Sequence, residues 1–362
     1  MDFDLTEEQQ LLRDVTRDVL SRDDDITGVA DADPGWRREV WNQLAEVGIL
    51  GLGFDPDEAG QIEVMVVMTE IGRRLAPEPV AAAALIPGGL LADLKADQQL
   101  LDEVAEGRTL LAFAHSEPGV RVPAGQPATT AERNGEDWTI TGRKSPVLGG
   151  DSADKVIVTA ALPDGGTGLF LVDAAAATRH AFRTFDGRRG AQLDFEGVPA
   201  EPLGTGDAGE HVTRTLVRFQ SALCAEAVGA MEESLRLTTE YLTSRKQFGV
   251  PLSKFQVLTQ RAADMYVSLE LARSMSFYAA MCIADGRFDP VIAARAKLQI
   301  GRSGRHIAQE AIQLHGGIGM TAEYPVGHYA ARLTAIDSTL GTTDDAVRTL
   351  SGHVGDYGIV SL

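Results

Sequence analysis

Two segments of the sequence combine residue types that could hold a phosphate group and an aromatic ring. In the first, residues 244–252, Arg245, Gln247 and Phe248 stand before a Gly-x-Pro turn, and Gln256 follows soon after. An arginine can bind a phosphate through two parallel hydrogen bonds, and an aromatic side chain can cover a planar ring. The ordinary alternative is a helix C-terminus at which basic side chains complement the helix dipole.

The second segment, residues 313–319, ends a helical pattern with glycines. Gln313 precedes Gly316 and Gly317. The backbone N–H groups of glycines can approach a phosphate or a ring closely, because glycine has no Cβ. An ordinary glycine cap is the alternative. Taken singly, each segment is better explained by its ordinary alternative, so it is their occurrence together that points to a ligand.

The elements that must position these segments follow from the spacing of apolar residues. Up to about residue 111 the apolar residues recur three, four and seven positions apart, which predicts helices, and Thr6 is placed to cap the first. From about residue 110 to 203, short apolar runs between Gly, Pro and Asp predict strands. After residue 209 long helical patterns return, over residues 212–243, 256–285, 290–314 and about 344–350.

The order of helices, then strands, then helices predicts an α+β protein and disfavours a doubly wound sheet, in which strands and helices would alternate. We expect a helical domain over residues 1–110, a β domain over residues 111–208 and a helical bundle over residues 209–362.

Composition narrows the class of protein. Hydrophobic residues make up 44% of the 362 residues and charged residues 23%, which is typical of a globular protein with a sizeable core. The net charge of −19 argues against a nucleic-acid or anionic-lipid partner, since both require clustered cations.

Cys224 and Cys282 lack CxxC spacing, and the scattered histidines show no metal-binding pattern, so we expect no metal site. The acidic first residues and the lack of a long apolar run favour a soluble, cytoplasmic protein.

Together, and in this order, the two segments resemble the acyl-CoA dehydrogenase family, which carries R-x-x-F-G-x-P-[LI]-x-x-F-Q and then Q-x-x-G-G-x-G. Further segments that resemble the family are residues 4–9, 48–52, 70–73, 116–119 and 139–144. The resemblance implies an N-terminal helical domain, a central β domain and a C-terminal four-helix bundle. It also implies FAD bound at subunit interfaces, usually in a dimer of dimers.

In that family a glutamate removes the α-proton of an acyl-CoA thioester while the β-hydride moves to flavin N5. The glutamate usually precedes a Gly-Thr pair near the end of the chain, and the matching position here is Leu340. Some members carry it instead on the helix that leads to R-x-x-F-G. That position is Phe219 here, followed by Gln220 where the family commonly has arginine. Because neither leucine nor phenylalanine can accept a proton, we expect no catalytic residue in this chain.

The stretches that would contact the flavin ring also depart from the family. Where the family has G-S-D, residues 120–123 read VRVP, and where it has W-[IV]-[TS]-N, residues 145–149 read SPVLG. Pro146 lacks an N–H and Leu148 lacks a hydroxyl, so hydrogen-bond donors expected at the ring are missing.

The two segments that do match the family are those with which family members contact the FAD of a neighbouring subunit, at its adenosine and pyrophosphate. The predicted cofactor-binding residues are Arg245, Gln247, Phe248, Gln256, Gln313, Gly316 and Gly317. The resemblance therefore indicates a non-catalytic subunit that completes the FAD site of a homologous catalytic subunit, in an α2β2 heterotetramer. It is similar to the two-subunit enzymes of bacterial steroid and cholesterol degradation. An acyl-CoA substrate and an acceptor like electron-transfer flavoprotein are the other expected partners.

Two alternatives stay open from the sequence. One is a homomeric acyl-CoA dehydrogenase with a relocated base, for which Glu226, Asp337 and Asp344 are the candidates. The other is a protein without flavin that holds an acyl-CoA or a partner chain.

Overall fold

Helices precede and follow a block of strands along the chain of the computed structural model, which describes residues 5–21, 29, 33–120, 122 and 126–356. Asp4, Arg121 and Pro123, which belong to segments compared above with the family pattern, lie outside these residues. The chain divides into two compact units, Met1–Val67 with Pro77–Phe219, and Met68–Ala76 with Gln220–Leu362. None of the described helices is long and apolar enough to cross a membrane.

The first unit opens with short helices. Thr6 caps the first of them: its hydroxyl accepts a hydrogen bond from Gln9 N, and Gln9 Oε1 accepts one from Thr6 N. Asp97 caps α6, a short helix that falls within the stretch up to about residue 111 that the sequence predicted to be helical. The helices that begin in this unit are α1 (Glu7–Ser21), α3 (Arg38–Glu46), η1 (Ile49–Gly51), α4 (Gln61–Arg74), η2 (Ala81–Leu85), α5 (Ile86–Asp93), α6 (Gln98–Ala105) and α7 (Gly209–Ser244).

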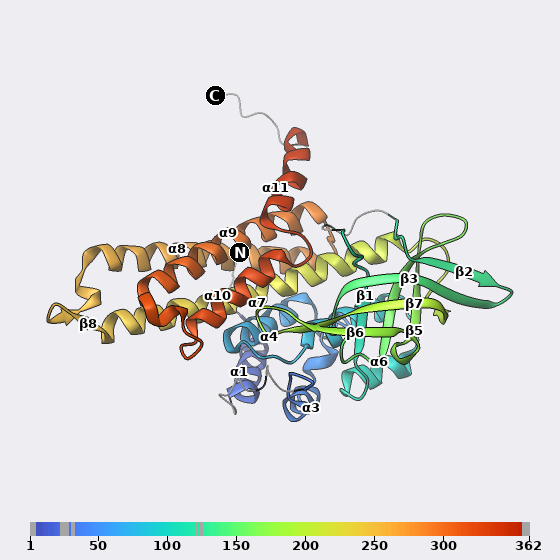
Figure 1. The fold of residues 1–362 in the computed structure, drawn as a ribbon, viewed down its shortest axis with the longest axis horizontal. Coiled ribbons are helices and arrows are strands. Elements are labelled where there is room, and N and C mark those ends of the chain that lie inside the picture. The colour runs from blue at the N-terminus through green and yellow to red at the C-terminus, as the bar shows by residue number, and fades with distance from the viewer. Residues whose placement is uncertain (1–4, 22–28, 30–32, 121, 123–125, 357–362) are drawn as a thin grey trace. The chain divides into compact units, whose positions relative to one another are not determined.

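Seven strands form one mixed sheet within the described residues, drawn in green in Figure 1. The pairings run β4–β2–β3–β7–β5 and return to β4, so the sheet closes around an apolar core, while β1 adds to β4 and β6 to β7. The strands are β1 (Leu111–Ala114), β2 (Thr130–Asn134), β3 (Asp137–Leu148), β4 (Lys155–Ala161), β5 (Thr167–Asp173), β6 (Thr178–Arg183) and β7 (Arg189–Pro202). Polar residues dominate β2 and β6, and the apolar pattern therefore missed both strands.

A fully buried lysine ties the strands of this unit together. Lys144 Nζ donates to Glu117 Oε1 at 2.7 Å, to Thr159 Oγ1 at 3.1 Å and to the carbonyl oxygen of His115 at 3.3 Å. Glu117 also accepts from the backbone N–H groups of Ala128 and Thr129. The pair thus fastens the segment after β1 to β3, β4 and the start of β2.

Burial and hydrogen bonding act in opposite directions on this pair. Burial raises the pKa of Glu117, but the hydrogen bonds from Lys144, Thr129 and Ala128 outweigh it and lower that pKa to about 2. Burial lowers the pKa of Lys144 to about 8, against the attraction of Glu117. The ion pair therefore keeps both groups charged at neutral pH.

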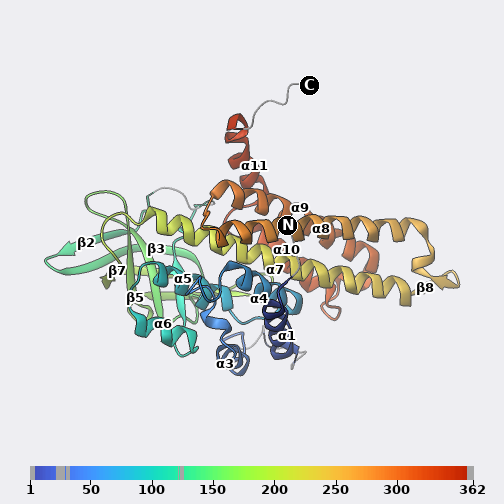
Figure 2. The ribbon, with the colours of Figure 1, turned by 180° about the vertical axis from the view of Figure 1, so that it is seen from behind.

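The second unit is a helical bundle, coloured yellow to red in Figures 1 and 2. It contains the α7 residues from Gln220 onward, α8 (Gln256–Ala284), α9 (Pro290–His315), α10 (Val326–Ser338) and α11 (Thr343–Gly352). Hydrogen bonds join α7 to α9 through Gln220 and α8 to α9 through Ser303. The sequence analysis predicted four helices after residue 209, and α10 is an additional helix between the third and the fourth.

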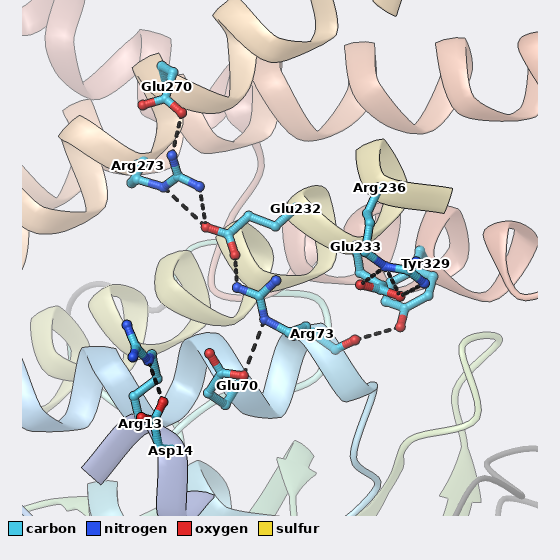
Figure 3. Close-up of polar contacts among 10 residues, drawn as sticks. All are labelled: Arg13, Asp14, Glu70, Arg73, Glu232, Glu233, Arg236, Glu270, Arg273 and Tyr329. Carbon is cyan, nitrogen blue, oxygen red and sulfur yellow. Dashed lines mark hydrogen bonds and ion pairs between the residues drawn. The ribbon is translucent and has the colours of Figure 1, made fainter. Parts of the chain in front are cut away.

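Two glycines let the last turns of α4 pack directly on α7. A Cβ at Gly72 would overlap the carbonyl oxygen of Glu226, and one at Gly229 would overlap that of Thr69. Next to this contact, Arg73 bonds to Glu70 and Glu232, and its carbonyl oxygen accepts a hydrogen bond from Tyr329 at 2.5 Å (Figure 3). The end of α4 is thereby fastened to α7 and α10.

Replacing Glu117 with Gln should destabilise the first unit by about 3–5 kcal/mol near neutral pH, because the buried Lys144 ammonium loses its counter-charge. The folded pKa of Glu117 lies below its usual 4.5, so its stabilising effect is complete above that pH and is lost as the pH falls toward about 2. Urea unfolding between neutral pH and about pH 3 should show a shallower loss of stability in Glu117→Gln than in the natural protein.

The double variant Glu117→Gln/Lys144→Met is the control for this experiment, because it removes both charges and should recover most of the lost stability. Equal destabilisation in the single and double variants would contradict the role given to the ion pair.

Gly229→Ala should destabilise the second unit by about 3 kcal/mol, because its methyl group can be accommodated only if the backbones of α4 and α7 separate. Gly304→Ala, within α9, is the matched control: its Cβ would make an ordinary contact with Leu333 at 3.5 Å. Helix propensity predicts that this control gains up to about 1 kcal/mol. Chemical denaturation measures both variants, and similar stabilities would argue against the close contact.

Candidate functional site

The Arg-x-x-Phe-Gly segment forms a tight hairpin after α7. Its strands, β8 (Lys246–Gln247) and β9 (Val250–Pro251), are paired antiparallel, and Phe248 and Gly249 form the two-residue turn. Both turn residues have positive φ, +53° and +85°, as a type I′ turn requires. The backbone N–H of Leu252 donates to the carbonyl oxygen of Arg245 at 2.9 Å and closes the base of the hairpin.

Phe248 is an unusual residue for this position. A left-handed backbone costs a residue with a Cβ roughly 1–2 kcal/mol relative to glycine. The ring does not recover this energy by burial, since the residue is 91% exposed and the ring meets Phe255 only edge-on, at 6.1 Å. A large apolar ring held exposed in a strained turn indicates a surface that binds something.

The Gln-x-x-Gly-Gly segment turns at the end of α9. The helix ends at His315, Gly316 adopts φ +64°, and the short helix η5 (Gly316–Met320) follows. A Cβ on Gly317 would meet no other atom within 4 Å, so this stretch of backbone is open to approach. Gly319 instead lies close to His315, whose Cβ would be 3.1 Å from an added Cβ.

Both segments lie at the same end of the bundle. The ring of Tyr241, in the last turn of α7, stacks on that of His315 with centroids 4.6 Å apart. Arg261, near the start of α8, pairs with Glu310 of α9 at 2.5 Å. These contacts place the glycine turn at the same end of the bundle as the hairpin and the start of α8. Figures 1 and 2 show the hairpin, at β8, between the end of α7 and the start of α8.

All seven residues predicted to bind a cofactor belong to this end of the bundle, and all are exposed: Arg245, Gln247, Phe248, Gln256, Gln313, Gly316 and Gly317. A guanidinium, amides, open backbone N–H groups and an exposed ring suit a ligand that combines phosphate with an aromatic base. Their role in binding stays a prediction. Tyr241 and His315 join the two segments. From the sequence His315 was interpreted as an ordinary polar residue, because its contact with Tyr241 spans 74 positions of the chain.

Leu340 lies in a firmly held loop between α10 and α11. It has φ +57°, and Gly341 follows with φ +97°. The buried Lys297 donates to the carbonyl oxygens of Ile336 at 2.6 Å and Thr339 at 2.8 Å. These contacts hold the backbone of the loop, but the side chain at position 340 is aliphatic and cannot act as a base.

The carboxylates considered as a relocated base are engaged or exposed. Arg332 donates to both oxygens of Glu226 at 2.8 Å, and the side chain of Glu226 is 4% exposed. Asp337 accepts from Thr343 N at 3.2 Å and from Arg305 at 3.1 Å. Asp344 is exposed in the first turn of α11. None of these settings favours proton abstraction, which requires a desolvated carboxylate with a free lone pair.

The stretch that would face a flavin ring lies on β3 and its end. The pairing with β7 shifts between Lys144 and Val147, so the strand bulges there. Val147 is fully buried in the core, Leu148 is half-buried and Pro146 is exposed. The side chains of this bulge offer a flavin ring no hydrogen-bond donor at Pro146 or Leu148.

Comparisons with known proteins agree on one family. Residues 112–198 match the description "Acyl-CoA dehydrogenase, middle domain" and residues 210–352 match "Acyl-CoA dehydrogenase, C-terminal domain". The chain is 32% identical over 358 residues to acyl-CoA dehydrogenase IpdE2 of Mycobacterium tuberculosis, covering 96% of this chain and 98% of that protein. It is 29% identical over 379 residues to the mitochondrial short-chain specific acyl-CoA dehydrogenase of Sus scrofa, covering 97% and 91%.

Solved structures show the same likeness. A variant of the Tcur3481-Tcur3483 steroid ACAD has a TM-score of 0.88 and 29% identity, with 97% of this chain and 98% of that chain covered. The ChsE4-ChsE5 complex from Mycobacterium tuberculosis has a TM-score of 0.88 at 24% identity, with 99% and 100% covered, which is a likeness of fold.

Phe248→Asn should keep the hairpin and stabilise it by up to about 1 kcal/mol, because asparagine before glycine is favoured in a type I′ turn. Thermal unfolding measures the change. Gly249→Ala is the control, since it adds a Cβ at φ +85° and should destabilise the same turn. A clear loss of stability in Phe248→Asn would mean that the ring serves the fold rather than a ligand.

Proposed function

The chain belongs to the acyl-CoA dehydrogenase family, whose members are FAD-dependent oxidoreductases with this mixed α+β fold, and we propose that it acts there as a non-catalytic subunit. In this role it completes the FAD site of a homologous catalytic subunit, in an α2β2 heterotetramer. One contrast carries the proposal: the loop that should carry the base presents Leu340, whereas the residues that would serve a neighbour's cofactor are intact and exposed.

The lack of a base extends beyond Leu340. Phe219, at the alternative position, is buried and apolar. Arg332 donates one hydrogen bond to each carboxylate oxygen of Glu226, so the side chain is oriented toward this guanidinium in a buried ion pair. These contacts favour a supporting subunit over a homomeric enzyme with a relocated base.

The exposed end of the bundle supports a role in a neighbour's site. Arg245 can bind a phosphate through two hydrogen bonds, and Phe248 can cover the adenine ring. Gln256 and Gln313 can bond to polar edges, while the N–H groups at Gly316 and Gly317 can approach the pyrophosphate. FAD bound between the subunits supplies the acceptor for the substrate hydride.

The residues of this chain thus suit only one half of FAD. Its bundle end matches the pyrophosphate and adenosine, whereas Pro146 has no backbone N–H and the side chain of Leu148 has no donor for the flavin ring. A chain that retained its own ring-binding site would need donors at that bulge. The exposed residues at the end of the bundle therefore suit an FAD whose flavin ring is bound by the other subunit.

An apolar face on α8 supports assembly with another chain. Val267, Leu271 and Tyr278 recur at spacings of four and seven, so they share one side of the helix, and all three are exposed. Exposed apolar stripes of this kind are typical of protein interfaces. We assign this face to the contact with the homologous subunit.

For the substrate we propose a bulky, steroid-derived acyl-CoA, with an acceptor like electron-transfer flavoprotein. The support is the similarity to a structure named as a steroid ACAD. A heterodimer with one working site could leave the second acyl pocket free for a polycyclic thioester.

For the cellular compartment we propose the cytoplasm. Cys224 and Cys282 are buried free thiols, which is compatible with a reducing cytoplasm.

The test is the FAD content and the acyl-CoA-dependent dye reduction of this chain, expressed alone and together with a homologous catalytic chain. We expect little FAD in the lone chain, and one FAD per heterodimer with turnover in the complex. Arg245→Ala should weaken FAD binding by the complex about tenfold or more, since it removes a charge-assisted hydrogen bond. Arg287→Ala, an exposed arginine beyond the other end of α8, is the control and should change little.

The alternative of a relocated base makes the opposite prediction. Stoichiometric FAD and turnover by the lone chain would refute the supporting-subunit function. In that case Asp337→Asn or Asp344→Asn should abolish turnover, whereas in the heteromer both variants should retain it.

A further inference from the structure

His315 ends α9 inside a cluster of three aromatic rings. The residue is 3% exposed. The ring of Tyr241, from α7, stacks on it at 4.6 Å, and the ring of Tyr324, from the segment before α10, lies 4.8 Å away. The two tyrosine rings also meet edge-on at 6.3 Å. The cluster therefore joins the ends of α7 and α9 to the segment that follows η5.

Hydrogen bonds define the orientation of the imidazole. Its Nδ1 lies 2.7 Å from the carbonyl oxygen of Ala311, which can only accept, so Nδ1 carries the proton and donates. Burial lowers the pKa of His315 and favours the neutral ring. The hydrogen bonds to the backbone carbonyls of Ala311 and Leu237 act in the opposite direction and raise this pKa, but burial outweighs them. In a neutral ring Nε2 is an acceptor, so the Tyr324 hydroxyl, 3.3 Å away, donates to it.

This chain of hydrogen bonds supports both predicted cofactor segments. The imidazole directly precedes Gly316, and Gly319 folds back against it. On the other side, the carbonyl oxygen of Tyr241 accepts a hydrogen bond from Arg245 N at 2.8 Å. The residue that stacks on His315 thus also holds the backbone of Arg245.

From this geometry we propose that Tyr324 and His315 are positioning residues for cofactor binding. They set the glycine turn at residues 316–320 relative to Arg245, so that both reach the same pyrophosphate. The proposal rests on the proposed function, because it concerns the FAD that this chain helps to hold in the complex. Neither residue touches the ligand; each acts through the segment to which it is bonded.

The test uses Tyr324→Phe in the complex with the catalytic chain, because this change removes one hydroxyl and retains the ring contacts. The FAD dissociation constant, measured by titrating FAD into the FAD-free complex and following flavin fluorescence, should rise about three- to tenfold, the worth of one neutral hydrogen bond. The melting temperature of the FAD-free complex should fall by only a few degrees, because one hydrogen bond to the buried imidazole is lost and the ring contacts remain. Turnover at saturating FAD should also equal that of the natural complex.

Tyr266→Phe is the matched control, since it removes a hydroxyl from an exposed tyrosine of the same bundle and should leave FAD affinity unchanged. A second variant, His315→Gln, keeps a side chain that can donate and accept, and should lose less affinity than His315→Ala. Equal losses in these two variants would mean that the hydrogen bonds of His315 are unimportant.

The outcomes separate this proposal from the proposed function. If Arg245→Ala weakens FAD binding and Tyr324→Phe does not, the positioning role is wrong and the supporting-subunit function stands. If neither variant changes FAD binding, both are wrong. If Tyr324→Phe lowers the melting temperature but leaves the FAD dissociation constant unchanged, the cluster serves the fold alone and the positioning role is refuted.

Discussion

The bundle depends on a backbone-to-backbone contact between the last turns of α4 and the middle of α7. Gly72 and Gly229 make this contact possible, because a Cβ at either position would overlap a carbonyl oxygen of the other helix. Side chains then extend it: Glu232 of α7 joins Arg73 to Arg273 of α8 (Figure 3). With α7 fixed in this way, its last turn can hold Tyr241 against α9 and present the hairpin beyond it.

The loop around Leu340 keeps its supporting contacts, although it has no acidic side chain that could act as a base. Gly301 gives the loop room, since a Cβ there would overlap side-chain oxygens of Asp337 and Thr343. Lys297 caps the end of α10 despite the cost of burying an ammonium group. These contacts stabilise the fold whichever side chain stands at position 340. A chain that supports a catalytic partner would need the loop and would have no need of the acid.

The sequence predicted most elements with a strong apolar period or a clear cap. The capping role of Thr6, the long helices after residue 209 and the α+β class of the family were confirmed. The strands β2 and β6 were not predicted, because they are polar and depend on pairing with neighbouring strands. The sequence prediction also lacked α10, although the buried residues Val326, Tyr329, Ala330 and Leu333 of this helix lie at spacings of three, four and seven. The division into three domains stays a prediction.

By itself the sequence determined which chemical groups the chain possesses: Leu340 cannot accept a proton and Arg245 can bind a phosphate in any fold. Only the tertiary structure decided which groups are available and which act together. Glu226 was a candidate base until Arg332, 106 positions later, was found on its carboxylate. Likewise Tyr241, His315 and Tyr324 form one cluster only because three helix ends meet. The physical reason is that short-range spacing governs helices and turns, whereas pairing between distant residues depends on how whole elements pack.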